Sequence, residues 1–415
     1  METFERLESN VRSYCRAFPT VFTLARNATL EDTTGRRYID FFAGASTLNY
    51  GHNNPQLKAD LLAYISADGI VHSLDMATRA KQQFLETLER IVLQPRNLSY
   101  RVQFTGPTGT NAVEAALKLA RRVTGRANVV AFTNGFHGMS LGSVAATGNR
   151  YYRKATGVAL SNVCFMPYDG YLGPEVDTLD YFEHALNDEG SGLDLPAAVL
   201  VETIQGEGGI NLASPAWLQR LAAICSRHEI LLIVDDIQMG CGRTGSFFSF
   251  EAAGIVPDIV TLSKSLSGYG LPLAVVLIRP DLDQWRPGEH SGTFRGNNLA
   301  FVTGSSALEH YWQDEQFARE VERKGQHMHA RLLAIAAQWG DPAVTVRGRG
   351  MIQALDCQTG SRALAVCRAA FERGLVIETS GARDHVVKCI PPLTIPDDEL
   401  EAGFAILGEC VQMAA

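Results

Sequence analysis

The chain has 415 residues, of which 46% are hydrophobic and 20% are charged, and its formal net charge is −8. That length suits two or three domains with sizeable cores, since a domain usually spans about 100–200 residues. The acidic balance argues against a general nucleic-acid binder, because phosphate neutralisation requires a basic surface. No stretch approaches the roughly 20 consecutive apolar residues of a membrane helix.

The N-terminus lacks the pattern of a targeting segment. Residues 1–8 are acidic and mixed, without the basic-then-apolar order of a signal peptide, so we expect a cytoplasmic protein. Eight cysteines are scattered from Cys15 to Cys410, with no C-x-x-C pair and no zinc-ligand spacing. We therefore expect buried, reduced thiols and no metal site.

Seven short apolar, β-branched runs alternate with helical patterns along the middle of the chain. The runs cover residues 101–104, 128–132, 163–165, 198–202, 231–235, 259–262 and 273–278. Several are apolar almost throughout, as in strands buried on both faces of a mainly parallel sheet. The predicted fold is α/β, with a large doubly wound, mainly parallel, seven-stranded sheet.

Two of the intervening segments predict helices with defined ends. Residues 110–124 place five apolar side chains on one face, while Glu114 and Lys118 are spaced to pair on another, and Gly125 ends the pattern. Residues 214–227 begin with a Ser-Pro pair, which suits a helix cap and first turn.

The two ends of the chain differ from the middle. Residues 1–60 and 305–415 mix helical patterns with short strands and carry much of the charge. We expect them to form together a small α+β domain, with residues 61–304 as the large domain. The polar segment 187–192 predicts a surface loop, because a strand of the same sheet follows it directly.

Ligands of open α/β sheets bind at the carboxyl ends of the strands, which directs attention to three places. The first is Gly106-Pro107-Thr108-Gly109-Thr110-Asn111, which joins a strand to a helix. Its glycines allow a close backbone approach, and the helix N-terminus offers N–H groups to an anion such as a phosphate. An ordinary strand–helix turn is an equal alternative for this motif alone.

The second place is the end of the run 231–235, where Asp235 and Asp236 follow one another. Two buried carboxylates require a cationic partner, and a protonated heterocyclic nitrogen is such a partner. The alternative is a helix cap or a solvated edge. Because side chains alternate along a strand, Asp235 is the one expected to point into the site.

The third place is Lys264, just after the run 259–262. A lysine held near a cation and away from water has a lowered pKa and acts as an amine nucleophile toward an aldehyde. Taken alone, such a lysine is more often a surface residue. One compact ligand with a phosphate, a basic ring nitrogen and an aldehyde uses all three places, and pyridoxal 5′-phosphate (PLP) is that ligand.

A competing motif is Gly240-Cys241-Gly242-Arg243-Thr244-Gly245, which matches the dinucleotide pattern G-x-G-x-x-G. That pattern should turn directly from a strand into a helix. Here five residues separate it from Val234, and residues 246–250 do not begin a helix. A nicotinamide-dependent oxidoreductase is therefore a remote alternative.

The order of several motifs resembles the class III aminotransferases of fold type I over nearly the whole chain. The motifs are Phe136-His137-Gly138, Glu202-Thr203-Ile204-Gln205-Gly206-Glu207-Gly208-Gly209, Asp235-Asp236-Ile237-Gln238 with Gly242-Arg243-Thr244-Gly245, Ser263-Lys264-Ser265 and Gly292-Thr293-Phe294. Each is moderately specific, and their joint order and spacing are highly specific.

The resemblance implies a PLP site with assigned roles. Lys264 would form the Schiff base, Asp235 would hold the pyridine nitrogen, and Gly109 with Thr110 would hold the phosphate. Phe136 would stack on the ring, Gln238 would lie near its hydroxyl, and His137 and Glu202 would complete the cofactor contacts. Thr293 would reach the phosphate of a neighbouring subunit, which implies at least a homodimer and allows a tetramer.

Within this family the densest resemblance is to members that form L-2,4-diaminobutyrate at the start of ectoine synthesis. It covers residues 8–14, 48–55, 72–76, 106–112, 267–272, 287–290, 293–300 and 378–381. The implied reaction is a ping-pong transfer of the amino group of L-glutamate to L-aspartate 4-semialdehyde.

Members acting on ornithine, acetylornithine or GABA remain the alternative, and two positions count against them. Where such relatives often carry arginines that bind substrate carboxylates, this chain has Met139 and Lys388. Lys388 and Arg295 are our candidates for the substrate carboxylates. An ion pair between Lys388 and Glu207 that only orders the pocket is an equal interpretation.

Overall fold

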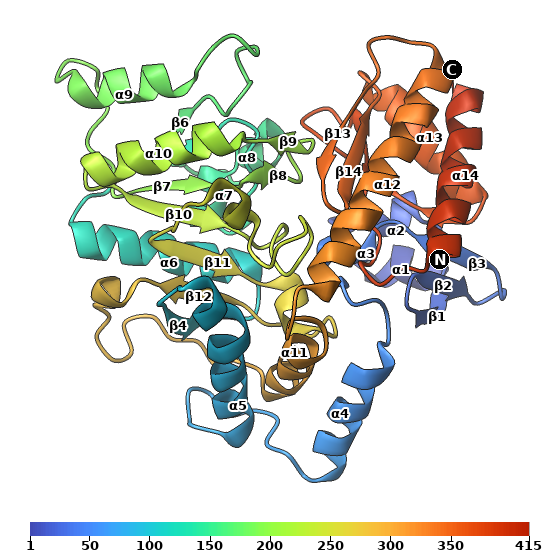
Figure 1. Ribbon diagram of the computed structural model, residues 1–415, viewed down its shortest axis with the longest axis horizontal. Coiled ribbons are helices and arrows are strands. Elements are labelled where there is room, and N and C mark those ends of the chain that lie inside the picture. Colours follow the sequence, from blue (N-terminus) through green and yellow to red (C-terminus); the bar gives the residue numbers. More distant parts are fainter. Residues whose placement is uncertain (415) are drawn as a thin grey trace.

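A seven-stranded sheet forms the centre of the larger part of the computed structural model, which describes residues 1–414 (Figure 1). Its strand order is β4 (Arg101–Phe104), β12 (Val275–Ile278), β11 (Ile259–Leu262), β10 (Leu231–Asp235), β7 (Ala198–Val201), β5 (Val129–Phe132) and β6 (Val163–Met166). All seven predicted runs are strands of this sheet, and only their ends shift by a residue or two.

The strand directions gather several strand ends at one edge of the sheet. β10 runs parallel to β7 and β11, and its last residue, Asp235, lies opposite Thr261 of β11. β5 is parallel to β7 and β6, whereas β12 is antiparallel to both of its neighbours. The sheet is therefore mainly parallel, as predicted, and the loops after β5, β7, β10 and β11 leave from the same edge.

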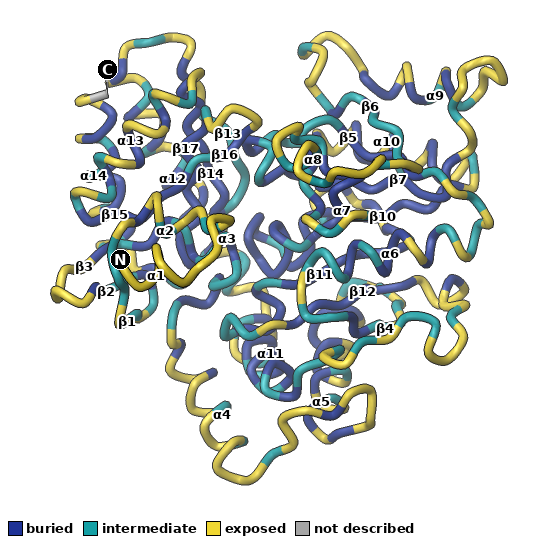
Figure 2. Tube along the Cα trace, turned by 180° about the vertical axis from the view of Figure 1, so that it is seen from behind, coloured by how far each residue is buried: buried dark blue, intermediate teal, exposed yellow. Residues whose placement is uncertain are grey.

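Both faces of the sheet are covered, because successive side chains point to opposite sides. Leu232 and Val234 pack into the apolar cluster that contains Trp217 of α10 (Pro215–Arg227). Leu231 and Ile233 pack on the other face, in the cluster with α6 (Gly109–Thr124). β7, β10 and β11 are buried throughout, as Figure 2 shows, which explains their unbroken apolar sequences.

The two predicted helices are confirmed as α6 and α10, including their ends. Gly125 ends α6 with a φ of +69°, a left-handed conformation that glycine adopts at little cost. Ser214 caps α10 by accepting a hydrogen bond from the backbone N–H of Trp217 at 3.2 Å. Residues 187–192 are exposed throughout, as expected for a surface loop, although Asn187 is still the last residue of α9 (Leu179–Asn187).

One local prediction is wrong, because within residues 1–414 Glu114 and Lys118 form no ion pair and each has other partners. Glu114 Oε1 instead accepts hydrogen bonds from Ser140 Oγ and from the backbone N–H groups of residues 142 and 143. Lys118 Nζ donates to the carbonyl of Glu289 at 2.6 Å. Three local donors outweigh an exposed pair that stabilises a helix by only about 0.2–0.5 kcal/mol.

The two ends of the chain meet in the smaller part of the molecule. β3 (Arg37–Asp40) pairs in parallel with β15 (Leu375–Val376), and Figure 1 shows both termini on this side. β15 completes a sheet with β1 (Phe22–Arg26) and β2 (Thr29–Asp32), while β13 (Thr345–Arg349), β14 (Ile352–Asp356), β17 (Val386–Cys389) and β16 (Glu378–Ser380) form another. This pairing supports a small unit built from both termini; the boundaries at residues 60 and 304 stay a prediction.

Helices complete both parts of the molecule. Those packed with the terminal sheets are α12 (Gln316–Trp339), α13 (Gly360–Glu372) and α14 (Asp397–Ala414), whose apolar faces share one core cluster. The others are α1 (Glu2–Leu7), α2 (Tyr14–Ala17), α3 (Ala43–Ser46), α4 (Pro55–Ser66), α5 (Arg79–Leu88), α7 (Leu141–Ala146), α8 (Arg150–Lys154), α9 (Leu179–Asn187) and α11 (Asn298–Tyr311), and a short hairpin joins β8 (Ile204–Gln205) to β9 (Asn211–Leu212).

The described residues contain no helix that is both long and apolar enough to span a bilayer. All eight cysteines are free thiols, six of them buried and two half-buried, as expected.

An aromatic cluster under β4 provides a test of this packing. Phe301 of α11 is fully buried, stacks on Phe84 at a centroid distance of 5.4 Å and contacts Phe104 in a tilted arrangement at 4.8 Å. Phe301→Ala should lower the free energy of unfolding by about 3–5 kcal/mol, because it leaves a cavity. Urea denaturation measures the loss, with Phe4→Ala on the exposed helix α1 as the matched control. Equal losses in the two variants would contradict this packing.

Candidate active site

The structure brings most of the predicted site residues to the carboxyl edge of the sheet. Gly109 and Thr110 follow β4, Phe136 and His137 follow β5, Glu202 and Glu207 follow β7, Asp235 and Gln238 lie at and after the end of β10, and Lys264 follows β11. The parallel register explains this gathering, because it places the ends of neighbouring strands side by side.

Asp235 is buried and held by three donors. His137 Nδ1 lies 2.7 Å from its Oδ2, and Oδ1 accepts from Thr261 Oγ1 at 3.1 Å and from the N–H of Ile237 at 3.2 Å. Burial alone would lower the pKa of His137, but the hydrogen bond and charge of Asp235 raise it above its usual value. The Asp235 carboxylate is thereby fixed in one orientation.

Asp236 points the other way, as strand alternation predicts. Its carboxylate accepts hydrogen bonds from the hydroxyl and the backbone N–H of Ser249. Burial raises the pKa of Asp236 to about 7. Of the two adjacent carboxylates, Asp235 is therefore the one that joins the His137 side of the site.

Glu202 orders the loop that carries Phe136. Its Oε1 accepts from the N–H of Phe136 at 2.9 Å, and its Oε2 accepts from the N–H of Gly206 at 3.4 Å. Burial raises the pKa of Glu202 to about 7. The Phe136 ring meets Tyr152 edge-on at a centroid distance of 5.6 Å, so the backbone and the ring of Phe136 each have a fixed contact.

The N-terminus of α6 forms a compact turn after β4. A Cβ added at Gly109 would lie 3.0 Å from the end of the Ile237 side chain, so the turn packs closely on the loop after β10. Thr110 Oγ1 lies 2.7 Å from Ser140 Oγ. The aligned peptide dipoles of this 16-residue helix favour an anion at its start.

Lys264 has the properties expected of an amine nucleophile. It is half-buried and has a φ of +48°, a conformation that costs energy for a residue with a side chain. Burial, together with the nearby charge of Lys388, lowers the pKa of Lys264, while Glu207 opposes the shift. The ε-amine is thus more readily neutral than that of a surface lysine.

Lys388 is fully buried between two carboxylates. Its Nζ lies 2.7 Å from Glu207 Oε1 and 2.8 Å from Glu378 Oε1. Burial would lower the pKa of Lys388, but the two carboxylates raise it. Burial would likewise raise the pKa of Glu207, yet Lys388 and Lys264 lower it to about 2, whereas burial raises that of Glu378 to about 7. A substrate carboxylate that reaches Lys388 must therefore compete with two existing partners.

Gln238 connects this ion cluster to the sheet edge. Its Nε2 donates to Glu207 Oε1 at 3.0 Å and to the carbonyl of Ala45 at 3.3 Å. Its Oε1 is buried and finds no hydrogen-bond partner anywhere in residues 1–414. An unpaired buried acceptor is costly, which makes it a natural contact for a ligand hydroxyl.

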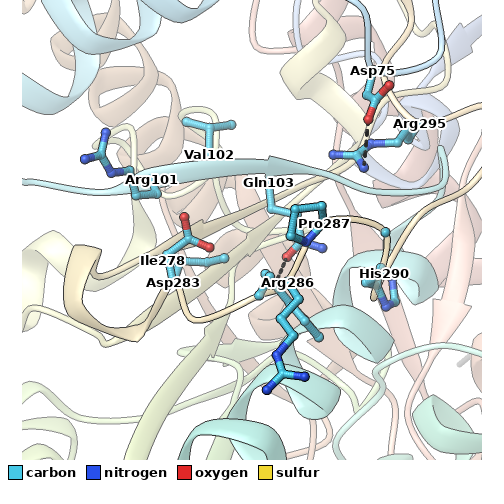
Figure 3. A pocket seen from close by; sticks show the side chains of 12 residues that line it. Asp75, Arg101, Val102, Gln103, Ile278, Asp283, Arg286, Pro287, His290 and Arg295 are labelled. Atoms are coloured by element: carbon cyan, nitrogen blue, oxygen red, sulfur yellow. Dashed lines mark hydrogen bonds and ion pairs between the residues drawn. The ribbon is translucent and has the colours of Figure 1, made fainter.

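Thr293 and Arg295 lie apart from these residues in the single chain. The Thr293 carbonyl lies 2.8 Å from His72 Nε2, and Arg295 Nη1 lies 3.9 Å from Asp75 Oδ2. Figure 3 shows Arg295 turned toward Asp75 at the edge strand β4. The cavity there has a volume of about 340 Å³ and is lined by Asp75, Arg101, Val102, Gln103, Ile278, Asp283, Trp285, Arg286, Pro287, Gly288, His290 and Arg295.

The dinucleotide-like segment 240–245 has no nucleotide-binding geometry. It lies between β10 and a short 3-10 turn (Ser249–Ala253), so it does not join a strand directly to a helix. Arg243 within it is fully buried. Nor does the described chain hold three or more His, Cys, Asp or Glu side chains placed to bind a metal ion.

Three contacts were missed from the sequence. Thr261 is the single polar residue of its strand, a signal that could have indicated a partner for Asp235. Glu378 lies directly opposite Lys388 in the register of β16 and β17, and that register was not predicted. Ser140 contacts Thr110 only because the loop after β5 folds back on α6, for which the sequence carries no local signal.

Glu202 allows a pH test of this geometry. Its pKa rises from about 4.3 in an unfolded chain to about 7 in the folded protein, so its stabilising contribution is complete below pH ~4.3 and is lost as the pH rises to 7. Urea denaturation of the apoenzyme should show wild type losing roughly 3 kcal/mol relative to Glu202→Gln across that range. Glu5→Gln, on the exposed helix α1, is the control. A flat difference for both variants would refute the assignment.

Comparison with known proteins places the whole chain in one family. Residues 12–411 match the family model described as Aminotransferase class-III. A diaminobutyrate–2-oxoglutarate transaminase of Bordetella parapertussis is 60% identical over 409 residues, covering 98% of this chain and 94% of that protein. The enzyme of the same name from Halomonas elongata is 58% identical over 416 residues, covering 100% and 99%.

Solved structures agree on the fold. An ornithine aminotransferase from Toxoplasma gondii, whose structure has PLP at partial occupancy in the active site, superposes with a TM-score of 0.85 at 27% identity, covering 100% of this chain and 93% of that one. An aminotransferase from Bacillus anthracis gives a TM-score of 0.88 at 22% identity, covering 99% and 97%. The fold type expected from the sequence is confirmed, and the chain belongs to the class-III aminotransferases.

Proposed function

We propose that this protein is a PLP-dependent diaminobutyrate–2-oxoglutarate transaminase, which transfers the amino group of L-glutamate to L-aspartate 4-semialdehyde. Relatives of that name at 60% and 58% identity over nearly full length support the substrates. The observation that carries the chemistry is Lys264, whose pKa is lowered by burial, at the same sheet edge as the Asp235–His137 pair.

The residues at this edge fit PLP by their chemistry. Asp235 suits a protonated ring nitrogen, and the unpaired Oε1 of Gln238 suits the ring hydroxyl. The N-terminus of α6, at Gly109 and Thr110, suits the phosphate, and the Phe136 ring suits a stacked pyridine. When bound, PLP supplies an aldehyde that captures the amino group and a ring that accepts the electron pair of the substrate carbon.

The protein side chains then supply proton transfer and orientation. Lys264 Nζ would hold the aldehyde group of PLP and, as a neutral amine, would carry the proton that leaves the substrate carbon. Asp235 would hold the ring nitrogen in its protonated form through its carboxylate charge. His137 and Thr261 hold Asp235 in the required orientation.

The transfer takes two half-reactions in one site. L-Glutamate gives up its amino group and leaves as 2-oxoglutarate, and L-aspartate 4-semialdehyde then receives the amino group at its aldehyde carbon to become L-2,4-diaminobutyrate. The two substrates enter in turn, so both carboxylates of glutamate and the one of the semialdehyde need cationic contacts. We retain Lys388 as a candidate contact for a substrate carboxylate. Of its two partners, Glu207 is the one that the substrate would displace, because its side chain is more exposed than that of Glu378 (26% against 9%).

We propose further that the active unit is at least a homodimer. Apolar side chains are exposed along α4, on the segment to α5 and on the 293–296 loop, including Ile65, Val71, Met76 and Phe294. His72, on the segment between α4 and α5, contacts the 293–296 loop. Its Nε2 lies 2.8 Å from the carbonyl oxygen of Thr293, and its ring meets the Phe294 ring edge-on. A patch of this kind favours association, and it would bring Thr293 and Arg295 to a neighbouring subunit's site.

Lys264→Ala should lower kcat by about 10⁴-fold or more, because both the covalent attachment and the proton carrier are lost. A coupled assay with glutamate as donor measures the loss, and Lys118→Ala, an exposed lysine whose Nζ donates to a backbone carbonyl, should leave kcat within about twofold. Ordinary turnover by Lys264→Ala would overturn the proposed chemistry.

The same assay tests the substrate. Aspartate, glutamate and succinate semialdehydes are compared as acceptors by kcat/KM, and we expect aspartate semialdehyde to be preferred by at least about 10-fold. A preference for glutamate or succinate semialdehyde would keep the cofactor chemistry but assign the chain to the ornithine or GABA type.

Mixed dimers test whether Thr293 serves the other subunit. Neither Lys264→Ala nor Thr293→Val homodimers should be fully active, but mixing them should restore one intact site in each hybrid dimer. Subunits are exchanged, hybrids are isolated by two affinity tags, and kcat is measured per dimer. Recovery to about half of the wild-type kcat supports a shared site. A hybrid no more active than the Thr293→Val homodimer shows that Thr293 acts within its own chain.

A further inference from the structure

Arg243 is a fully buried cation whose only hydrogen-bond acceptors within the described chain are neutral. Its Nη2 donates to Asn49 Oδ1 at 2.5 Å, and its Nη1 donates to the carbonyls of Pro391 at 2.6 Å and Met351 at 3.0 Å. Burial lowers the pKa of Arg243 to about 9. The charge of Asp40 opposes this shift, but no hydrogen bond joins Asp40 to Arg243 within the described chain. Burying a guanidinium with so little compensation is costly, so its place here calls for a reason beyond local packing.

Arg243 is connected to Lys264 by hydrogen bonds through Asn49 and Ser265. The N–H of Asn49 donates to Ser265 Oγ at 3.0 Å, and Ser265 directly follows Lys264. Asn49 Nδ2 also donates to the carbonyl of Cys241 at 3.0 Å, so the amide is held at both ends. The Asn49 backbone is thereby fixed by its own side chain against Arg243 and Cys241.

The segment before Asn49 is strained and depends on the same contacts. Residues 43–46 have φ values of +46°, +56°, +55° and +69°, a left-handed turn that disfavours every residue except Gly44. The carbonyl of Ser46 accepts from Ser265 Oγ at 2.7 Å, and that of Ala45 accepts from Gln238. Such a turn persists only where its surroundings hold it.

Arg243 also contacts the part of the small sheet that carries Lys388, through the carbonyls of Pro391 and Met351. Pro391 closely follows β17, the strand that carries Lys388, and Met351 lies between β13 and β14. The N–H of Met351 returns a hydrogen bond to the carbonyl of Arg243 at 3.0 Å, so both backbone and side chain contact this part of the molecule. Arg243 thus joins the loop beside Lys264 to the sheet that carries Lys388.

We propose that Arg243 and Asn49 are positioning residues, which fix Lys264 through Ser265 relative to the Lys388–Glu207 pair. The planar guanidinium sends two donors in set directions, and a lysine ammonium lacks this fork. The proposal rests on the role of Lys264 proposed above. The segment 240–245 would therefore support catalysis indirectly, because Arg243 within it positions the residue that reacts.

The test is a double-mutant cycle between Arg243 and Ser265, which both contact Asn49. The variants are Arg243→Lys, Ser265→Ala and their combination, with Asn49→Ala in place of Arg243→Lys if the latter fails to fold. Leu332→Ala, in the core cluster of the terminal sheets, is the control for loss of stability. The measurements are kcat/KM for each half-reaction, the pH midpoint of the visible absorbance of the PLP-bound enzyme, and the rate of PLP uptake by the apoenzyme.

We expect each single variant to lower kcat/KM by about 10- to 100-fold, since small misplacements of reacting groups have effects of this size. The kcat/KM of the double variant should be no lower than that of the less active single variant, because both substitutions break the same connection between Arg243 and Lys264. The absorbance midpoint should shift by about 0.5 pH unit or more, and PLP uptake should slow. Leu332→Ala should lower thermal stability and leave the midpoint unchanged.

Effects that simply multiply in the double variant, or an absorbance midpoint that stays at its wild-type value, would overturn the proposal. This failure is distinct from failure of the proposed function. If Lys264→Ala retains turnover, the function itself is wrong; if Lys264→Ala is inactive while Arg243→Lys behaves like Leu332→Ala, only the positioning role is wrong.

Discussion

The parallel register of β7, β10 and β11 is the constraint on which the site depends. It places Asp235 opposite Thr261 and brings the loops that carry Glu202 and Lys264 to one edge of the sheet. Apart from Thr261 and Lys264, which both belong to β11 and the turn after it, these side chains lie far apart in sequence. A shift of one residue in β10 would turn Asp235 toward the opposite face and exchange it with Asp236.

Several charged side chains lie at this edge of the sheet, and they differ in how far neighbouring groups of the chain compensate their charge. Asp235 is matched by His137, and Lys388 by two carboxylates, so both are compensated within the chain. Lys264 is left with a lowered pKa and Gln238 with an unpaired oxygen. Lys264 and Gln238, two of the groups that suit the cofactor, therefore keep unmatched capacity, whereas Asp235 also suits it and is already held by His137.

The sequence predicted the sheet and the principal cofactor residues because their signals are local. Buried strands read as unbroken apolar runs, and an aspartate or lysine directly after such a run has a defined place. The partners of those residues could not be predicted in the same way. The contact of Glu378 with Lys388 depends on the register of the β16–β17 pair. The hydrogen bonds of Glu114 depend on a loop that folds back over α6. Contacts between distant parts of the chain, such as Arg243 with Pro391, leave no pattern in either segment.

The pairing of β3 with β15 has a consequence for biosynthesis. β3 ends at Asp40, whereas β15 begins at Leu375, so the first sheet of the chain stays incomplete until residues 375–376 have left the ribosome. At ~5–20 residues per second, the exposed edge of β3 waits on the order of tens of seconds for its partner. During that interval it is open to pairing with other chains, and a nascent-chain chaperone that shields residues 22–40 would raise the yield of folded protein.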